Sequence, residues 1–264
     1  MMRLVGILVV LLGVLGTAPG AAADEPGDLS LVSAINKAGR QRMLSQRIVL
    51  LYCQAGLGVM PDPSRAKLAE AVDLFDAQLT ELRGIAPTPA VRDALVQVEQ
   101  IWTPFAAIAR RPPDRAGAER LLYWNDDLLF LSNKVVQLLQ DQSDEPYARL
   151  VNIAGRQRML SQRAAKFYML QEWGFDSHSI RDELDRARSE FIGALEVLRA
   201  APESTDAIRE ALDDAEQAWA WFDNALTLRG AETFRLVVAD STEAILDQMD
   251  RVTAMYERLP SQGP

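Results

Sequence analysis

The sequence predicts an all-α protein made of two tandem antiparallel four-helix bundles, related by an internal pseudo-two-fold axis. The first observation is an identical repeat, because residues 38–47 and residues 154–163 both read AGRQRMLSQR. The second is a series of long helix-favouring segments that proline and turn residues interrupt. The third is that Asn36 matches Asn152 at an offset of 116, and other residues of the two halves match likewise. Short connections between four helices favour an antiparallel bundle in each repeat. One continuous eight-helix domain is the alternative.

The first 23 residues have the pattern of a secretory signal peptide. Arg3 gives a basic start, and residues 4–16 form an apolar run that is short for a membrane span. Small residues at 21–23 offer a cleavage site, so we expect residues 1–23 to be removed and the product to be exported to the periplasm. A retained membrane anchor is the alternative. We expect no integral membrane segment after cleavage, because no later stretch approaches the ~20 consecutive apolar residues of a membrane helix.

The two predicted units occupy residues 24–142 and residues 143–264. In the first, prolines near 61–63, 87–89 and 112–113 separate helices expected near 28–58, 63–84, 89–110 and 114–141. In the second, breaks near 176–177, 202 and 228–230 separate helices expected near 146–173, 179–200, 205–228 and 231–258. The offset changes from 116 to 117 in the later helices, which places a one-residue insertion in a loop, where insertions are tolerated.

The net charge and the scarcity of cysteine and histidine argue against several classes of function. The net charge of −9 becomes −10 when the segment containing Arg3 is removed, and so acidic a protein is a poor candidate for binding nucleic acid. Cys53 is the single cysteine and His178 the single histidine. Intrachain disulfides, metal sites and Ser–His or Cys–His catalysis therefore lack the partners they need. We expect no enzyme activity, no cofactor and no metal.

The helix that carries the repeated motif is apolar on every side in both units. Such a helix is buried on every side, so we expect each copy to pack inside its own bundle and also against the other copy. One face of the helix wheel carries the sets Gly39, Arg42, Gln46 and Gly155, Arg158, Gln162. Glycine weakens a helix interior by up to ~1 kcal/mol relative to alanine, so its presence in both copies indicates a close approach there. Packing these faces across a local two-fold axis would bring Arg42 near Arg158.

The two motif helices are purely basic in an acidic protein. No Asp or Glu lies between Asp28 and Asp62, or between Glu145 and Glu172. Buried guanidinium groups stay charged and need counter-charge. One source is internal, from acids on the last helix of each unit: Asp126, Asp127, Asp240, Glu243 or Asp247. The other is a small oxyanion shared by two arginines, whose planar guanidinium groups suit flat anions. Both sources of counter-charge are compatible with the sequence.

The segments INKAGRQRMLSQR (35–47) and VNIAGRQRMLSQR (151–163) resemble the P-box of nitrate-sensing receptors. They resemble still more closely the PilJ-type sensor domain at the N-terminus of type IV pilus chemotaxis transducers. The resemblance implies four-helix sensor bundles that meet at their P-box helices and share one anion on the axis. Its arginine corresponds to Arg42 and Arg158, and its glycine to Gly39 and Gly155. The neighbouring residues that would support this site are Asn36, Asn152, Gln46, Gln162, Arg40, Arg156, Arg47 and Arg163.

Two functions follow from these observations. The main hypothesis is a soluble periplasmic sensor that binds a small inorganic oxyanion, nitrate or nitrite, between the two P-box-like helices. The alternative is a ligand-free helical interaction module associated with a chemoreceptor or a type IV pilus system. Receptors with this motif carry a second membrane helix and an output domain, which we do not find after the second repeat. We therefore expect the protein to pass its state to a membrane-bound receptor or kinase.

Overall fold

The computed structural model describes residues 30–145 and 147–260, and the predicted signal peptide, residues 1–23, lies outside them. The described residues form helices and connecting turns, without a strand. In chain order the helices are α1 (Leu31–Leu57), α2 (Pro61–Ile85), α3 (Pro89–Ala109), α4 (Arg115–Gln140), α5 (Ala148–Glu172), α6 (His178–Ala200), α7 (Asp206–Leu226) and α8 (Glu232–Glu257). The predicted all-α fold is confirmed.

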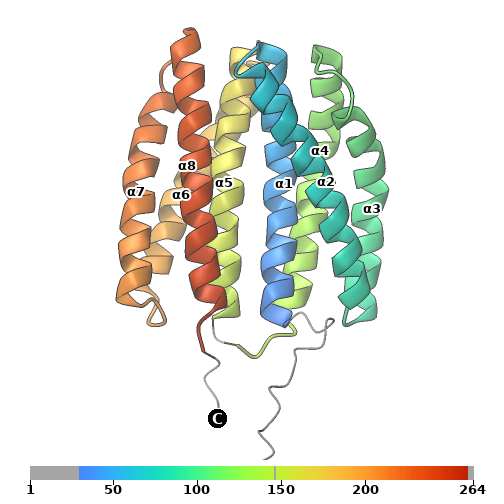
Figure 1. Cartoon of the computed structure of the whole chain (residues 1–264), viewed down its shortest axis with the longest axis vertical. Coiled ribbons are helices and arrows are strands. Elements are labelled where there is room, and N and C mark those ends of the chain that lie inside the picture. The colour runs from blue at the N-terminus through green and yellow to red at the C-terminus, as the bar shows by residue number, and fades with distance from the viewer. Residues whose placement is uncertain (1–29, 146, 261–264) are drawn as a thin grey trace, which may run out of the picture.

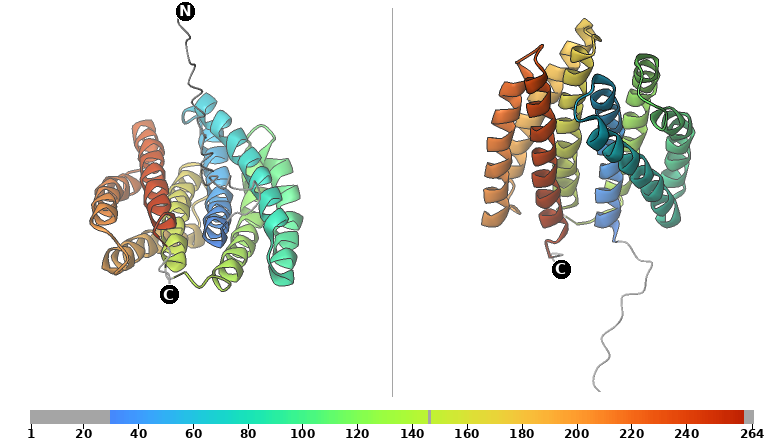
Figure 2. Two further views of the ribbon diagram at one scale, coloured as in Figure 1. Left: turned by 60° about the horizontal axis from the view of Figure 1, so that its bottom comes forward. Right: turned by 45° about the horizontal axis from the view of Figure 1, so that its top comes forward.

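The helices form two side-by-side sets, α1–α4 and α5–α8, with α1 and α5 adjacent at the centre (Figure 1). Within the first set α2 and α4 pack on α1, and α3 packs mainly on α4. The second set repeats this order, with α6 and α8 on α5 and α7 on α8. Views from both ends show one set on each side of the α1–α5 pair (Figure 2). This arrangement fits tandem bundles, while the boundary at residues 142 and 143 stays a prediction.

Matching aromatic contacts show that the two sets are packed alike. Phe75 stacks on Trp102 with ring centroids 3.8 Å apart, and Phe191 stacks on Trp219 at 3.7 Å. Each pair joins the second helix of its set to the third. The sequence offsets of 116 and 117 therefore describe equivalent positions in space.

Local sequence sets most helix ends close to their predicted places. Side-chain oxygens of five N-cap residues accept a hydrogen bond from a backbone N–H in the first turn: Ser30, Thr88, Asp114, Ser177 and Thr205. Gly58 ends α1 in the left-handed conformation, at φ 75°. Helix α2 begins at Pro61, two residues before the predicted start, since proline is tolerated in the first helical turn.

Helix α1 is buried around its whole circumference over residues 41–55, and α5 is nearly so over residues 157–171, as their sequences predicted. Ile48, Val49 and Leu50 follow one another in α1, and each has 0% exposed surface. Three successive positions span most of a helical turn, so no single face could bury them. Cys53 on the same helix is also buried and has a free thiol. The contact between α1 and α5 is thus part of the hydrophobic core.

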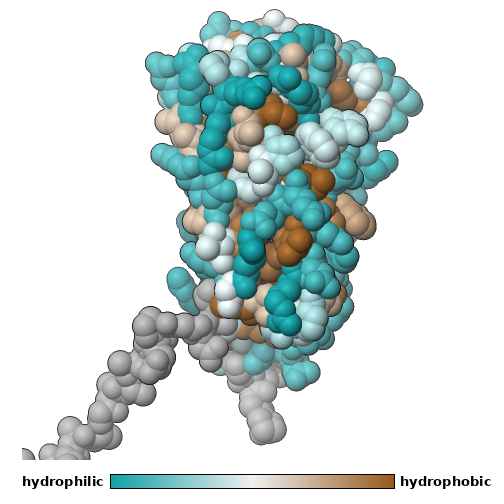
Figure 3. All heavy atoms as spheres, turned by 90° about the vertical axis from the view of Figure 1, so that its right-hand side faces the viewer, coloured by the Kyte–Doolittle hydropathy of each residue, from teal (hydrophilic) through white to brown (hydrophobic). Residues whose placement is uncertain are grey.

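The face of the molecule on the α3 side is mainly polar. On the side of the molecule shown in Figure 3, hydrophilic residues surround small, separate apolar areas. None of the helices in the described residues is both long and apolar enough to cross a membrane.

Candidate functional site

The repeated glycines and arginines meet at the contact between α1 and α5. A Cβ atom added to Gly39 would lie 3.3 Å from Arg42 Nη2 and 3.7 Å from Arg158 Nη2. A Cβ atom added to Gly155 would lie 3.1 Å from Arg158 Nη2 and 3.8 Å from Arg42 Nη2. Both guanidinium groups therefore lie beside both glycines, as the helix wheel predicted. The missing glycine side chains leave the space that the two arginine termini occupy.

Neutral side chains from α4 and α5 hold Arg42. Its Nη1 donates to Asn133 Oδ1 at 2.9 Å. Its Nη2 donates to the Asn152 side-chain oxygen at 2.7 Å and to the Asn152 backbone oxygen at 3.2 Å. Arg42 is 1% exposed, and no residue in the described part of the chain accepts a hydrogen bond from its Nε. Among the described residues, no carboxylate forms an ion pair with Arg42.

Arg158 repeats this geometry in the other half, but with a carboxylate in place of one amide. Its Nη2 donates to Asn36 Oδ1 at 2.7 Å and reaches the Asn36 backbone oxygen at 3.5 Å. Its Nη1 donates to Asp250 Oδ1 at 2.5 Å. Each motif arginine therefore bonds to an asparagine of the other repeat. These reciprocal hydrogen bonds connect the two halves.

Burial changes the acidity of both arginines. Burial, followed by the positive charges of Arg156 and Arg158, lowers the pKa of Arg42 from 12.5 to about 9. Burial also lowers the pKa of Arg158, and the carboxylate of Asp250 opposes that change. With a pKa of about 9, Arg42 remains a cation at neutral pH. The positive charge of Arg42 is less compensated than that of Arg158, which pairs with the carboxylate of Asp250.

Two further motif arginines link each motif helix to acids on neighbouring helices. Arg47 binds Glu243 through both terminal nitrogens, at 2.5 and 2.8 Å. Arg163 binds Glu183 at 2.6 Å and lies 3.5 Å from Asp126. The carboxylate pairs of these two arginines connect each motif helix to a helix packed against it.

The remaining predicted neighbours of the site divide between its centre and its edge. Gln46 and Gln162 lie deeper along the α1–α5 contact, where Gln46 Oε1 accepts from Arg163 at 3.4 Å and Gln162 Oε1 accepts from Arg47 at 3.1 Å. Arg40 and Arg156 lie at the edge and form ion pairs instead of facing the axis. Arg40 lies 3.1 Å from Asp250, and Arg156 lies 2.6 Å from Glu190.

Lys166 is a buried lysine that sequence reasoning did not place at the site. Its Nζ donates to Asn125 Oδ1 at 2.7 Å and to Gln46 Oε1 at 2.8 Å, and it lies 4.0 Å from the centroid of the Phe167 ring. Burial, then the charge of Arg163, lowers its pKa well below 10.5. The sequence did contain a signal for this residue, because Lys166 occupies the position that matches Leu50 in the first repeat.

The predicted internal counter-charges are partly correct. Glu243 and Asp126 do contact motif arginines, whereas Asp127, Asp240 and Asp247 form no ion pair with them. The acids that sequence reasoning missed are Asp250, Glu183 and Glu190. The acid that reaches a motif arginine depends on how far each outer helix is shifted along the motif helix. The residue pattern of a single helix does not reveal this shift.

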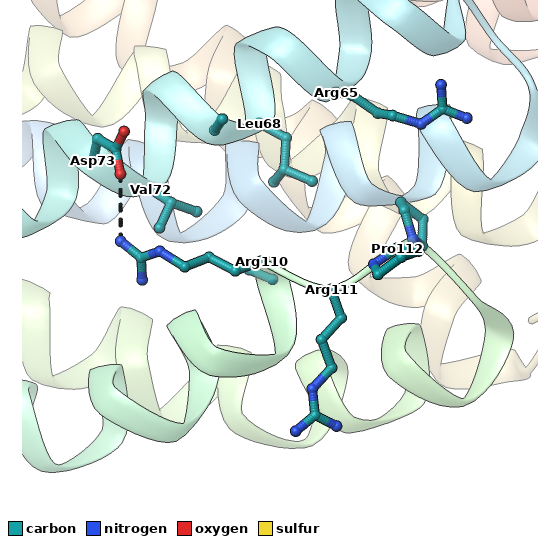
Figure 4. A pocket seen from close by; sticks show the side chains of 10 residues that line it. Arg65, Leu68, Val72, Asp73, Arg110, Arg111 and Pro112 are labelled. Atoms are coloured by element: carbon teal, nitrogen blue, oxygen red, sulfur yellow. Dashed lines mark hydrogen bonds and ion pairs between the residues drawn. The ribbon is translucent and has the colours of Figure 1, made fainter.

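A surface pocket of about 340 Å³ lies between α2 and the end of α3, and it contains no motif residue. Figure 4 shows Arg110 reaching Asp73 across this pocket, beside Leu68 and Val72. Arg110 also pairs with Asp76 at 2.6 Å, so its charge is already matched. The described residues also hold no group of three or more His, Cys, Asp or Glu that could bind a metal.

Replacing Glu243 by glutamine should destabilise the protein at neutral pH. Burial opposes ionisation of Glu243, but hydrogen bonds and charges from Arg47 and Lys67 outweigh it and lower its pKa below 4.5. The ionised form therefore stabilises the fold above pH 4.5, and this contribution is lost as the pH falls through the lowered pKa. We expect Glu243→Gln to reduce the free energy of unfolding by about 2 kcal/mol at pH 7.

Urea unfolding at several pH values measures this effect. The difference from wild type should shrink in acid, because both proteins then lack the carboxylate. Glu196→Gln, at an exposed position on α6, is the control and should leave stability unchanged. A difference for Glu243→Gln that stays constant down to strongly acidic pH would contradict the assignment.

Comparisons with known proteins identify the family. Residues 29–121 and 140–252 match the family described as PilJ, type IV pili methyl-accepting chemotaxis transducer N-term. The matched segments cover more than half of the chain and include both copies of the motif. Comparisons with curated proteins and with solved structures found no match. The chain therefore belongs to the PilJ family, whose N-terminal domains are helical sensing domains of periplasmic type rather than catalytic ones.

Proposed function

We propose that this chain is a periplasmic helical interaction module of a chemoreceptor or type IV pilus system. Its membership of the PilJ family supports a signalling role in contact with a membrane-bound receptor. The observation that carries the proposal is the reciprocal bonding of Arg42 to Asn152 and of Arg158 to Asn36. These bonds tie the two halves to each other, so a partner that shifts one motif helix must also disturb the other half.

This function does not require a ligand. Arg158 has the carboxylate partner that a structural motif needs, and Arg42 has three acceptor atoms from two asparagines. Export through the predicted signal peptide, residues 1–23, would deliver the module to the periplasm. A membrane-bound receptor or kinase would then carry the signal onward.

Oxyanion binding is a second candidate function, which one observation favours. Nη2 atoms from Arg42 and Arg158 converge beside Gly39 and Gly155, and Arg42 has no carboxylate partner among the described residues. Two like charges this close repel each other, and a shared anion would relieve that repulsion. Nitrate or nitrite between the P-box-like helices would meet an arginine from each repeat.

Deleting the chain from its host tests the main proposal. We expect type IV pilus-driven movement or the chemotactic response to change, and the wild-type chain to restore it. The double variant Asn36→Ala/Asn152→Ala removes the side-chain acceptors that join the halves, and should restore it poorly. Asn224→Ala, at an exposed position on α7, should restore it fully. Unchanged movement and chemotaxis after deletion would rule the proposal out.

Calorimetric titration with nitrate, nitrite, chloride and sulfate tests the second candidate. We expect nitrate or nitrite to bind, because a planar anion can accept from two guanidinium groups at once. Arg42→Met and Arg158→Met should each abolish the binding, with circular dichroism to confirm that they fold. Arg111→Met, at an exposed position outside the helices, is the control. No heat and no thermal shift with any of the four anions would exclude oxyanion binding.

A further inference from the structure

The networks around Arg42 and Arg158 have the same geometry but different charges. Arg158 Nη1 donates to the carboxylate of Asp250 at 2.5 Å. Arg42 Nη1 donates to the carboxamide of Asn133 at 2.9 Å. Asn133 and Asp250 are 117 positions apart and lie at matching places on α4 and α8. One half therefore has a negative charge where the other has a neutral group of nearly the same shape.

A second amide-for-carboxylate difference lies in the next hydrogen bonds of the two networks, which Asn36 and Asn152 donate. Asn36, which accepts from Arg158, donates its Nδ2 to Glu257 Oε2 at 2.6 Å. Asn152, which accepts from Arg42, donates its Nδ2 to Gln140 Oε1 at 2.6 Å. Gln140 and Glu257 are again 117 positions apart. The Arg42 side therefore carries two amides in place of two carboxylates, and no carboxylate in residues 30–145 or 147–260 pairs with its buried cation.

A second arginine stands at the edge of each network. On the Arg158 side, the Asp250 carboxylate also lies 3.1 Å from Arg40, so it bridges two guanidinium groups. On the Arg42 side, the matching residue Arg156 pairs instead with Glu190 of α6. The Arg156 and Glu190 side chains are 49% and 37% exposed, so their ion pair is weak and is readily exchanged for another anion.

We propose that Arg42 and Arg156 bind a small monocarboxylate of the formate or acetate class beside Asn133, at the edge of the contact between α4 and α5. The chain would hold one such ligand, because Asp250 already fills the equivalent role on the Arg158 side. The proposal rests on the oxyanion-binding candidate and gives it a ligand class and an off-axis position.

Three features of the edge fit a carboxylate ligand. In the other half, the arginines that match Arg42 and Arg156, which are Arg158 and Arg40, share the carboxylate of Asp250. Asn133 uses its oxygen for Arg42, and within the described residues its Nδ2 has no protein partner, so it supplies a donor to an anion. Asn133 is also half-buried, so a small ligand reaches it from solvent without separating α1 from α5.

Thermal unfolding and calorimetry with sodium formate and acetate, at constant ionic strength against sodium chloride, test the proposal. The wild-type protein should be stabilised by formate or acetate, with one site per chain. Asn133→Asp supplies the missing carboxylate, so it should raise the melting temperature without ligand and weaken formate binding by about tenfold or more. Arg156→Gln, at a half-exposed position, should also weaken formate binding. Asn224→Asp adds the same charge on α7 and should change neither property.

Two results would overturn the proposal. One is wild-type protein that neither formate nor acetate stabilises. The other is Asn133→Asp protein that binds formate as tightly as wild type. Titration with nitrate distinguishes the failure of the carboxylate proposal from the failure of the oxyanion-binding candidate. If nitrate binds and depends on both Arg42 and Arg158 while formate does not bind, the on-axis site stands and the carboxylate site does not.

Discussion

Two arginine side chains, Arg42 and Arg158, are removed from water where α1 meets α5. Burying an ion costs several kcal/mol unless nearby groups compensate for its lost hydration. Hydrogen-bond acceptors must therefore lie within reach, and each arginine takes one of them from the opposite repeat, Asn152 for Arg42 and Asn36 for Arg158. The two halves cannot separate without leaving these cations poorly bonded. This constraint sets the helix contact, and the outer helices pack around it.

The same contact explains why ten residues are identical in both repeats. Gly39 and Gly155 make room for both guanidinium groups. Other motif residues repeat their contacts, since Gln41 donates to the Phe75 carbonyl at 2.9 Å and Gln157 to the Phe191 carbonyl at 2.8 Å. A residue that serves a symmetric contact is constrained in both copies. Residues of the outer helices differ more between the two repeats, and the amides and acids around Arg42 and Arg158 are among those that differ.

Helical periodicity and the repeat were enough to predict the fold and the centre of the site. A helix that is apolar on every side predicted the α1–α5 contact, and the spacing of Gly39 and Arg42 predicted the meeting of the arginines. The partners on outer helices could not be predicted, because contacts such as Arg158 with Asp250 depend on how far α8 is shifted along α5. Lys166 was not placed at the site, although the burial predicted for its helix and its match to Leu50 both indicated that it would be covered.

A double-mutant cycle between Arg42 and Asn152 tests most directly whether these bonds hold the two halves together. The free energy of unfolding would be measured for wild type, Arg42→Met, Asn152→Ala and the double variant. A charge-assisted hydrogen bond between buried groups predicts a coupling of about 1.5–3 kcal/mol. Effects of the two substitutions that add to within about 0.5 kcal/mol would contradict the account.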